Sequence, residues 1–274
     1  MNKDIGFVTF AQNTKEVNYL ELAYLQAMNC KKTNPTFGYT VIVDNPTKDF
    51  IEEKHLKVFD QIIHQPLDLD WPMANEWKVY YFTPYYETIK IESDLLFSKS
   101  IDHWLKLLRS KDIVLATGCK DYFGNDSKQR FYRKFIDDNL LPDIYNGLIY
   151  FRKTPQAQQF FDLAKTVCQN WDYLKSNVLI NCREDSPSTD HYYAVTADLY
   201  GRENCTIPTA DFFKFVHMKT RIQNWNVDEN WSDSIFTEID EDILRINNLN
   251  QYNPVHYYDK TIAKNLIDYY EQRI

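Results

Sequence analysis

Glycine is scarce in this chain. Six glycines occur among 274 residues, and no two of them have the spacing of a G-x-G-x-x-G turn or of a P-loop. The backbone cradles that classical dinucleotide and ATP sites use therefore cannot form, and both site classes are excluded.

Long hydrophobic runs are also missing. No stretch reaches the length of about 18 apolar residues that a membrane-spanning helix needs, and the N-terminus enters a strand-like segment without signal-peptide features. We therefore expect a cytoplasmic protein without membrane insertion. The five cysteines are widely spaced and contain no Cys-x-x-Cys pair, which favours reduced thiols over disulfides or a zinc site.

Positive charge is in deficit. The formal net charge of −8 argues against broad nucleic-acid binding, which depends on many Lys and Arg, although it leaves room for a local basic patch. The chain does contain 44% hydrophobic and 16% aromatic residues, a composition typical of a folded protein with a sizeable core.

Strand and helix patterns alternate along the sequence. β-branched or apolar runs predict strands, and apolar residues at helical spacing predict helices between them. Strands are expected at 5–10, 39–43, 88–91, 113–117 and 146–151, and helices at 15–30, 50–60, 74–86, 101–108, 154–170, from 188 onward, and 261–272. The alternation predicts an α/β fold with a mainly parallel sheet flanked by helices.

Two acidic residues follow the third expected strand directly. Glu92 and Asp94 lie at the carboxyl end of this strand, where open α/β sheets bind their ligands. Alternate residues of an extended segment point to one side, so the two carboxylates can share a hard cation such as Mg²⁺ or Mn²⁺ while Ser93 points away. Two solvated loop acids are the alternative, because short acidic pairs are common.

The surrounding segment, residues 77–105, resembles GT-A glycosyltransferases, and particularly the glycogenin-like retaining family. That family has a helix with a lysine, then a strand, an Asp-x-Asp and a helix that ends near a Trp. The resemblance implies that Glu92 and Asp94 are the two metal-binding acids and that Lys78 is the helix lysine near the nucleotide. It differs from the family in having Glu at the first acidic position.

Further stretches resemble the family in the same order. Residues 5–11 are similar to its first strand, 41–44 to its second, 145–151 to the strand that contacts the sugar, and 189–190 to the acidic start of a helix. The resemblance implies donor-binding roles for Thr9, Ala11 and Asp44, and catalytic roles for Asn146 and Asp190. It also implies a GT-A domain at 1–228, with an acidic segment and a helix at 229–274 packing on it.

The third metal ligand is expected near the end of this domain. His217 and Trp225 have the separation of the family's His-x-x-Gly-x-x-Lys-Pro-Trp, but the Gly and the Lys-Pro are missing. Lys219 or Arg221 would then supply the contact to the diphosphate, since a diphosphate leaving group needs positive charge. His217 is the expected ligand, and His256 is the competing candidate.

The function implied is transfer of a hexosyl or pentosyl group from a nucleotide-diphosphate donor, UDP-sugar first, to an acceptor hydroxyl with the help of Mn²⁺ or Mg²⁺. In a retaining transfer Asp190 and Asn146 would position the sugar, whereas in an inverting one Asp190 would be the general base. The resemblance favours retention.

The acceptor is expected to be a saccharide. A basic and aromatic run at 128–135 also offers a nucleic-acid base as an alternative acceptor, bound through Lys128, Arg130, Arg133 and Lys134. An amphipathic helix with Phe131 and Phe135 buried explains the same run without any ligand.

Two other functions are compatible with a sheet of this type. A sugar-nucleotide pyrophosphorylase would need a glycine-rich basic loop after the first strand, and residues 9–13 lack one. A catalytically inactive nucleotide-sugar-binding module would keep the sheet and lose turnover.

Overall fold

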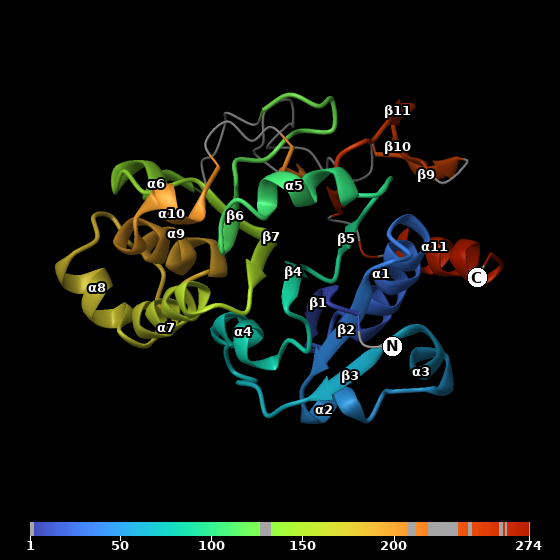
Figure 1. Ribbon diagram of the computed structural model, residues 1–274, viewed down its shortest axis with the longest axis horizontal. Coiled ribbons are helices and arrows are strands. Elements are labelled where there is room, and N and C mark those ends of the chain that lie inside the picture. The colour runs from blue at the N-terminus through green and yellow to red at the C-terminus, as the bar shows by residue number, and fades with distance from the viewer. Residues whose placement is uncertain are drawn as a thin grey trace.

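A six-stranded mixed sheet forms the centre of the molecule (Figure 1). The computed structural model describes residues 3–126, 133–207, 212–218, 235–240, 243–257, 260 and 262–273. In the order of the sheet, the strands are β3 (Gln61–His64), β2 (Gly38–Val43), β1 (Ile5–Ala11), β4 (Glu87–Ile91), β7 (Ile144–Arg152) and β6 (Ile113–Thr117).

Most of the strand pairs are parallel. β3, β2, β1 and β4 run in one direction, whereas β7 is antiparallel to both β4 and β6. β6 therefore runs in the same direction as β4, and both strands end at the same edge of the sheet. The expected α/β class with a mainly parallel sheet is confirmed.

Helices cover both faces of this sheet. On one face α1 (Tyr19–Thr33) packs against β1 and β2, and α11 (Ile262–Glu271) packs on α1. The other face is covered by α7 (Pro155–Gln169) and α9 (Thr189–Tyr200), which pack against each other. The shorter helices are α2 (Asn45–Lys48), α3 (Glu53–Val58), η1 (Pro72–Lys78), α4 (Val79–Phe82), η2 (Asp102–Trp104), α5 (Leu105–Leu108), α6 (Lys134–Asp138), α8 (Trp171–Asn177) and α10 (Arg202–Cys205).

Two small sheets complete the fold. β5 (Leu95–Leu96), β12 (Val255–His256) and β8 (Val216–His217) form one of them, with β12 in the middle. β9 (Thr237–Asp240), β10 (Ile243–Ile246) and β11 (Leu249–Asn250) form the other. The C-terminal part of the chain thus supplies the middle strand of a sheet whose outer strands come from earlier segments.

The structure differs from the sequence expectations at β3 and in the segment expected as a helix at 74–86, besides the short strands of the two small sheets. β3 was not expected, because its four residues, Gln-Ile-Ile-His, do not alternate between apolar and polar side chains. The helix expected at 74–86 is instead the 3₁₀-helix η1 followed by one turn of α-helix, and it ends at Phe82. Thr83 precedes Pro84, and a residue before proline is disfavoured in helical conformation.

None of the helices in the described part of the chain is both long and apolar enough to cross a bilayer.

Two of the few glycines make room for one aromatic ring. Gly6 of β1 and Gly38 of β2 are partners in register, and Tyr85 lies over both of them. A Cβ atom at Gly6 would lie 2.3 Å from the Tyr85 ring, and one at Gly38 would lie 2.4 Å from its hydroxyl. The hydroxyl of Tyr85 also pairs with that of Thr40 at 2.8 Å. These glycines are needed for close packing rather than for a phosphate-binding turn.

We predict that Gly6→Ala destabilises the protein by about 1–3 kcal/mol, the usual cost of an overpacked core. In a Tyr85→Leu background the same change should cost much less, because the ring that it strikes is gone. Urea unfolding of the four proteins measures both costs, and equal costs in the two backgrounds would contradict this account of the glycine pair.

Candidate active site

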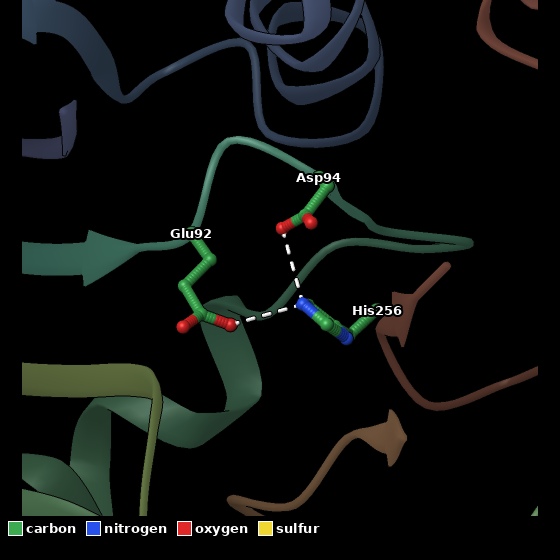
Figure 2. A group of neighbouring side chains, drawn as sticks. All are labelled: Glu92, Asp94 and His256. Atoms are coloured by element: carbon green, nitrogen blue, oxygen red, sulfur yellow. Dashed lines mark ion pairs between the residues drawn. The ribbon is translucent and has the colours of Figure 1, made fainter. Parts of the chain in front are cut away.

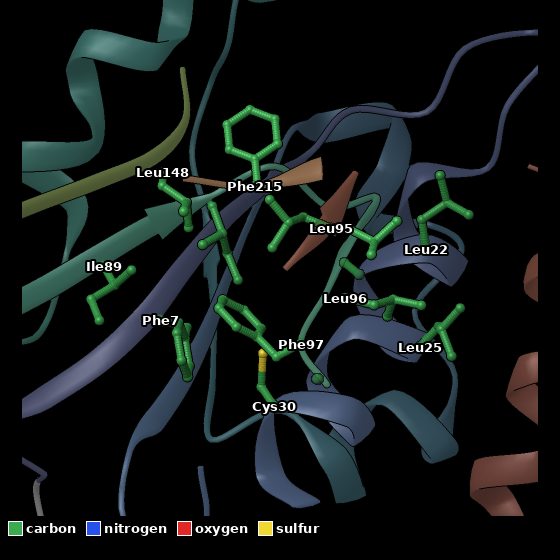
Figure 3. Close-up of a cluster of buried hydrophobic side chains, with 14 of the residues drawn as sticks. Phe7, Leu22, Leu25, Cys30, Ile89, Leu95, Leu96, Phe97, Leu148 and Phe215 are labelled. Atoms are coloured by element: carbon green, nitrogen blue, oxygen red, sulfur yellow. The ribbon is translucent and has the colours of Figure 1, made fainter. Parts of the chain in front are cut away.

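The turn after β4 is held firmly by buried neighbours. β4 ends at Ile91, and the next residues, Glu92 to Asp94, lead into β5. The amide of Gln26, on α1, donates to the carbonyl of Leu95 at 2.6 Å and to that of Glu92. Leu95 and Leu96 are buried in the main hydrophobic core, which keeps the turn in place (Figure 3).

Glu92, Asp94 and His256 converge at this turn. The Nε2 atom of His256 lies 3.1 Å from Oε2 of Glu92 and 3.2 Å from Oδ1 of Asp94 (Figure 2). One ligand atom from each residue lies within 4.8 Å of the others. Two carboxylate oxygens and one imidazole nitrogen therefore point at a common position, which is an arrangement that could hold a metal ion.

Strand pairing brings His256 to this position. β12 pairs antiparallel with β5, which places His256 opposite Leu95, and the backbone N–H of Tyr257 donates to the carbonyl of Asp94 at 3.1 Å. The histidine thus approaches the two acids from a segment more than 150 residues away in sequence. A short sequence motif cannot predict pairing between strands that lie so far apart in the sequence.

The charges in the cluster compensate one another. Burial alone would lower the pKa of His256, but the charges of Asp94 and Glu92 outweigh this and raise it to about 9. Burial alone would raise the pKa of both acids, but the charge of His256 outweighs it and holds the pKa of Glu92 and of Asp94 well below the usual range. Both carboxylates are thus anionic and available as ligands, whereas His256 must release its Nε2 proton before that nitrogen can bind a metal.

Lys260 adds a second cation to the cluster. Its ammonium group pairs with Oδ2 of Asp94 and donates to the carbonyl of Tyr257 at 2.7 Å. Like His256, it belongs to the C-terminal part of the chain. Both of these cations therefore come from the C-terminal part of the chain.

His217 lies directly behind His256. β8 and β12 are parallel, with His217 and His256 in register, and their Nδ1 atoms are 3.1 Å apart. The rings of Tyr145 and Phe215 pack edge-on against His217. The structure therefore brings His256, the competing candidate, together with the acids and places His217 as its neighbour.

A bulge directs Asn146 toward the acids. The pairing of β7 with β6 jumps from Ile149 to Tyr145, so that residues 146–148 have no partners in β6. The side-chain amide of Asn146 lies 3.4 Å from Oε1 of Glu92. This bulge connects the strand expected to contact the sugar to the cluster of Glu92, Asp94 and His256.

Asp190, at the start of α9, holds the backbone of this bulge. Its Oδ1 atom accepts from the N–H of Asn146 at 2.7 Å, and its Oδ2 atom accepts from Arg133 at 2.7 Å. Arg133 is buried, pairs with Asp143 at 2.9 Å and stacks on the ring of Tyr145. Both oxygens of Asp190 are thus committed to structural contacts.

The burial of Arg133 removes one of the four basic residues from the alternative nucleic-acid patch. Its guanidinium faces Asp143 and Asp190 inside the protein, where no phosphate can reach it. Lys134 is exposed, whereas Lys128 and Arg130 lie outside the described residues. Nothing in the described part of the chain supports nucleic-acid binding by this run.

A cavity of about 230 Å³ opens beside the cluster. Glu92, Asp94 and His256 line it together with residues of β1 and η1, including Thr9 and Glu76. The hydroxyl of Thr9 is buried without a hydrogen-bond partner among the described residues. A buried polar atom of this kind calls for a ligand or water, because leaving it unpaired costs free energy.

A buried ion pair forms another part of this wall. Glu76 and Lys90 are 2.5 Å apart, and Lys90 is 1% exposed. The ammonium of Lys90 also lies 3.4 Å from the carbonyl of Asn146. The pair thus connects the wall of the cavity to the bulge.

The other expected donor-binding residues lie at different distances from the cavity. Ala11 is buried at the end of β1, and Asp44 caps α2 and meets Gln12, which lines the cavity. Lys78 donates to Asn75 at 2.7 Å and does not line the cavity. Lys219 and Arg221 lie outside the described residues.

Sequence reasoning missed Glu76, Lys90 and Lys260. Lys90 did carry a signal, because a lysine inside the apolar strand 88–91 must find a partner when that strand is buried. Glu76 and Lys260 carried none, since each is an ordinary charged residue within a helical or polar stretch.

Solved structures resemble the whole fold. No protein-family model matches the chain, and no curated protein matches it in sequence. The galactosyltransferase LgtC, solved with donor and acceptor sugar analogues, is 11% identical with a TM-score of 0.54, over 97% of this chain and 95% of LgtC.

Two further matches are weaker. Mouse xyloside xylosyltransferase 1 is 9% identical over 84% of this chain and 91% of its own, with a TM-score of 0.49. The 4-diphosphocytidyl-2C-methyl-D-erythritol synthase of Anaerococcus prevotii is 12% identical over 74% of this chain and 85% of its own, with a TM-score of 0.42. The likeness to LgtC confirms the expected GT-A fold.

We predict that Arg133→Met destabilises the protein by about 3–5 kcal/mol, because it leaves the partly buried Asp143 and Asp190 without their buried cation. Arg202→Met is the matched control, since Arg202 is exposed and pairs with Asp198 on the surface. It should change the stability by no more than about 0.5 kcal/mol. Thermal or urea unfolding measures both, and equal stabilities of the two variants would refute a structural role for Arg133.

Proposed function

We propose that this chain is a metal-dependent glycosyltransferase that moves a sugar from a nucleotide-diphosphate donor to an acceptor hydroxyl. The observation that carries the proposal is the cluster of Glu92, Asp94 and His256 at the wall of a cavity. It lies at the carboxyl edge of the sheet, where α/β folds of this kind bind their ligands. The GT-A fold supports the same function by analogy.

The residues fit a hard divalent cation. Glu92, Asp94 and His256 would hold Mn²⁺ or Mg²⁺ through two carboxylate oxygens and one imidazole nitrogen. When bound, such a cation supplies Lewis-acid stabilisation to the charge that grows on a departing diphosphate. His217 would orient His256 from behind, as the partners of metal-binding histidines commonly do.

Lys260 is suited to the diphosphate of the donor. Its ammonium already contacts Asp94 and lies at the cluster, so it places positive charge where the leaving group would gather negative charge. This is the role that the sequence resemblance implied for Lys219 or Arg221. Unlike Lys219 and Arg221, Lys260 belongs to the described residues, and its contact with Asp94 supports this role.

Asp190 and Asn146 are positioning residues in this proposal. Asp190 accepts hydrogen bonds at both carboxylate oxygens and thereby fixes the bulge that holds Asn146 against Glu92. A carboxylate held in this way is poorly placed to take a proton from an acceptor. The arrangement favours a retaining transfer, in which the leaving phosphate oxygen takes the proton of the acceptor hydroxyl, over an inverting one with Asp190 as base.

The donor would lie in the cavity between β1 and η1. Thr9 offers an unpaired buried hydroxyl there, and Ala11 and Asp44 stand at the ends of β1 and β2, where the base of a nucleotide such as UDP would fit. Glu76 lines the same cavity and would accept hydrogen bonds from sugar hydroxyls.

The first test is turnover of the donor. We predict that the protein hydrolyses or transfers sugar from a UDP-sugar in the presence of Mn²⁺, and that Asp94→Asn lowers this rate at least about 100-fold. Even the loss of an outer partner of a metal site costs 10- to 100-fold. Asp185→Asn is the control, because Asp185 is an exposed acid far from the cavity and should leave the rate unchanged.

The assay measures product formation as the amount of UDP released. Turnover that survives Asp94→Asn would refute the metal assignment. Binding of nucleotide and Mn²⁺ by calorimetry, with no turnover of any UDP- or GDP-sugar, would identify an inactive binding module instead.

A metal-binding measurement distinguishes the roles of His217 and His256. His256→Ala should weaken Mn²⁺ binding more than His217→Ala does, because the first removes a ligand and the second only its neighbour. Calorimetric titration of each variant with Mn²⁺ alone measures the difference. The reverse order would make His217 the ligand.

A further inference from the structure

A groove distinct from the cavity beside Glu92, Asp94 and His256 lies between two loops at the edge of the molecule. Its volume is about 480 Å³. One wall is the loop that follows β6 and includes Tyr122 and Phe123. The other is the hairpin of β10 and β11 with the segment after it, at the upper right of Figure 1.

The topology places this groove on the same edge as the metal cluster. β6 and β4 run in the same direction, since both are antiparallel to β7, so the loop after β6 and the turn after β4 leave the sheet at the same edge. Val216 lines the groove, and its neighbour His217 contacts His256. On the other wall, Asn253 precedes His256 by three residues, a span of at most about 10 Å.

Aromatic rings line the groove and remain open to solvent. Phe123 is 51% exposed and Tyr252 is 56% exposed, and the ring of Tyr122 lies 4.1 Å from that of Phe123. Such rings combine a flat apolar face with, in tyrosine, a polar tip. The same face can cover the apolar C–H side of a sugar ring.

The remaining lining is rich in side-chain amides. Asn248, Asn250 and Asn253 line the groove beside the rings, and each amide has two N–H donors and one oxygen acceptor. One N–H of Asn250 donates to the hydroxyl of Tyr252 at 3.4 Å, and one of Asn253 donates to the carbonyl of Lys214 at 3.2 Å, which leaves the second N–H of each for a ligand hydroxyl.

Arg245 is the only charged side chain among the described residues that line it, and it is paired with Glu238 and Asp240 at 3.2 Å each. A lining of rings and amides, in which the one charged side chain is paired, fits a neutral polyhydroxylated ligand.

The groove is held in shape by contacts across it. The amide of Gln251 donates to the carbonyl of Tyr122 at 3.0 Å, which ties the hairpin segment to the opposite loop. Asn247 and Asn248 both have positive φ, the conformation of a tight hairpin turn that asparagine tolerates. A preformed groove loses less entropy when it binds a ligand than a flexible one does.

We propose that this groove binds the acceptor saccharide, a neutral oligosaccharide that stacks on Phe123 and Tyr252 and is held by the amides of the hairpin. The proposal rests on the glycosyltransferase function proposed above and names the substrate class of the same site. It places the non-reacting part of the acceptor in the groove, with its terminal hydroxyl directed toward the metal cluster.

The test is saccharide binding by saturation-transfer NMR. The probes are lactose, cellobiose, maltose and xylobiose at millimolar concentration, each added to the intact protein. At least one should receive saturation, and Phe123→Ala and Tyr252→Ala should each weaken its binding about three- to tenfold. Phe50→Ala and Tyr173→Ala are the controls, since these rings are 57% and 63% exposed on other surfaces, and both should bind as the wild type does.

The outcomes separate this proposal from the proposed function. If the wild type hydrolyses a UDP-sugar but no disaccharide binds, or if binding survives both groove variants, the groove assignment is wrong and the enzyme assignment stands. If a disaccharide binds through the groove but no donor is turned over, the groove stands and the enzyme assignment fails.

A third arm uses a short single-stranded oligonucleotide. Lys99 lies 5.7 Å from the centre of the Tyr252 ring, so a cation is within reach of the groove. Oligonucleotide binding that displaces the disaccharides and is lost in Tyr252→Ala would overturn the saccharide proposal.

Discussion

Two carboxylates held side by side at the end of a buried strand repel each other, and in the metal-free protein cations from elsewhere in the chain compensate them. In this chain the cations are His256 and Lys260, and both come from the C-terminal part. β12 carries His256 into place by pairing with β5 on one side and β8 on the other. A segment that looks like an appendage in sequence is therefore a structural part of the site.

The part of the site around Asn146 depends on a second group of paired charges. Arg133 is buried between Asp143 and Asp190, and Asp190 in turn holds the backbone of the bulge at Asn146. A buried arginine between acids is costly to break, so this network fixes the bulge rigidly. Asn146 then contacts Glu92, which joins the two halves.

The fold was largely readable from the sequence, because its strands and crossover helices have strong hydrophobic periodicity. β1, β2, β4, β6 and β7 all fall where β-branched or apolar runs predict them. The 3₁₀-helix η1 was predicted as part of a longer α-helix, since side-chain spacing does not distinguish the two helix types over seven residues. The short strands of the C-terminal part have only two to four residues each and leave no periodic signal.

The site was readable only where its residues are adjacent in sequence. Glu92 and Asp94 stood out because they follow a strand, whereas His256 could be proposed only as an alternative to His217, because strand pairing between distant segments decides which of the two faces the acids. Arg133 looked like part of a surface patch, since its basic neighbours gave no hint that it turns inward.

The central claim is that a metal binds at Glu92, Asp94 and His256 together with a nucleotide diphosphate. Crystals grown with UDP and Mn²⁺, measured at the manganese absorption edge, test it most directly. The account predicts one strong anomalous peak bonded to these three side chains and to the diphosphate. A manganese peak bonded elsewhere, or UDP bound in the cavity with no metal at this cluster, would contradict it.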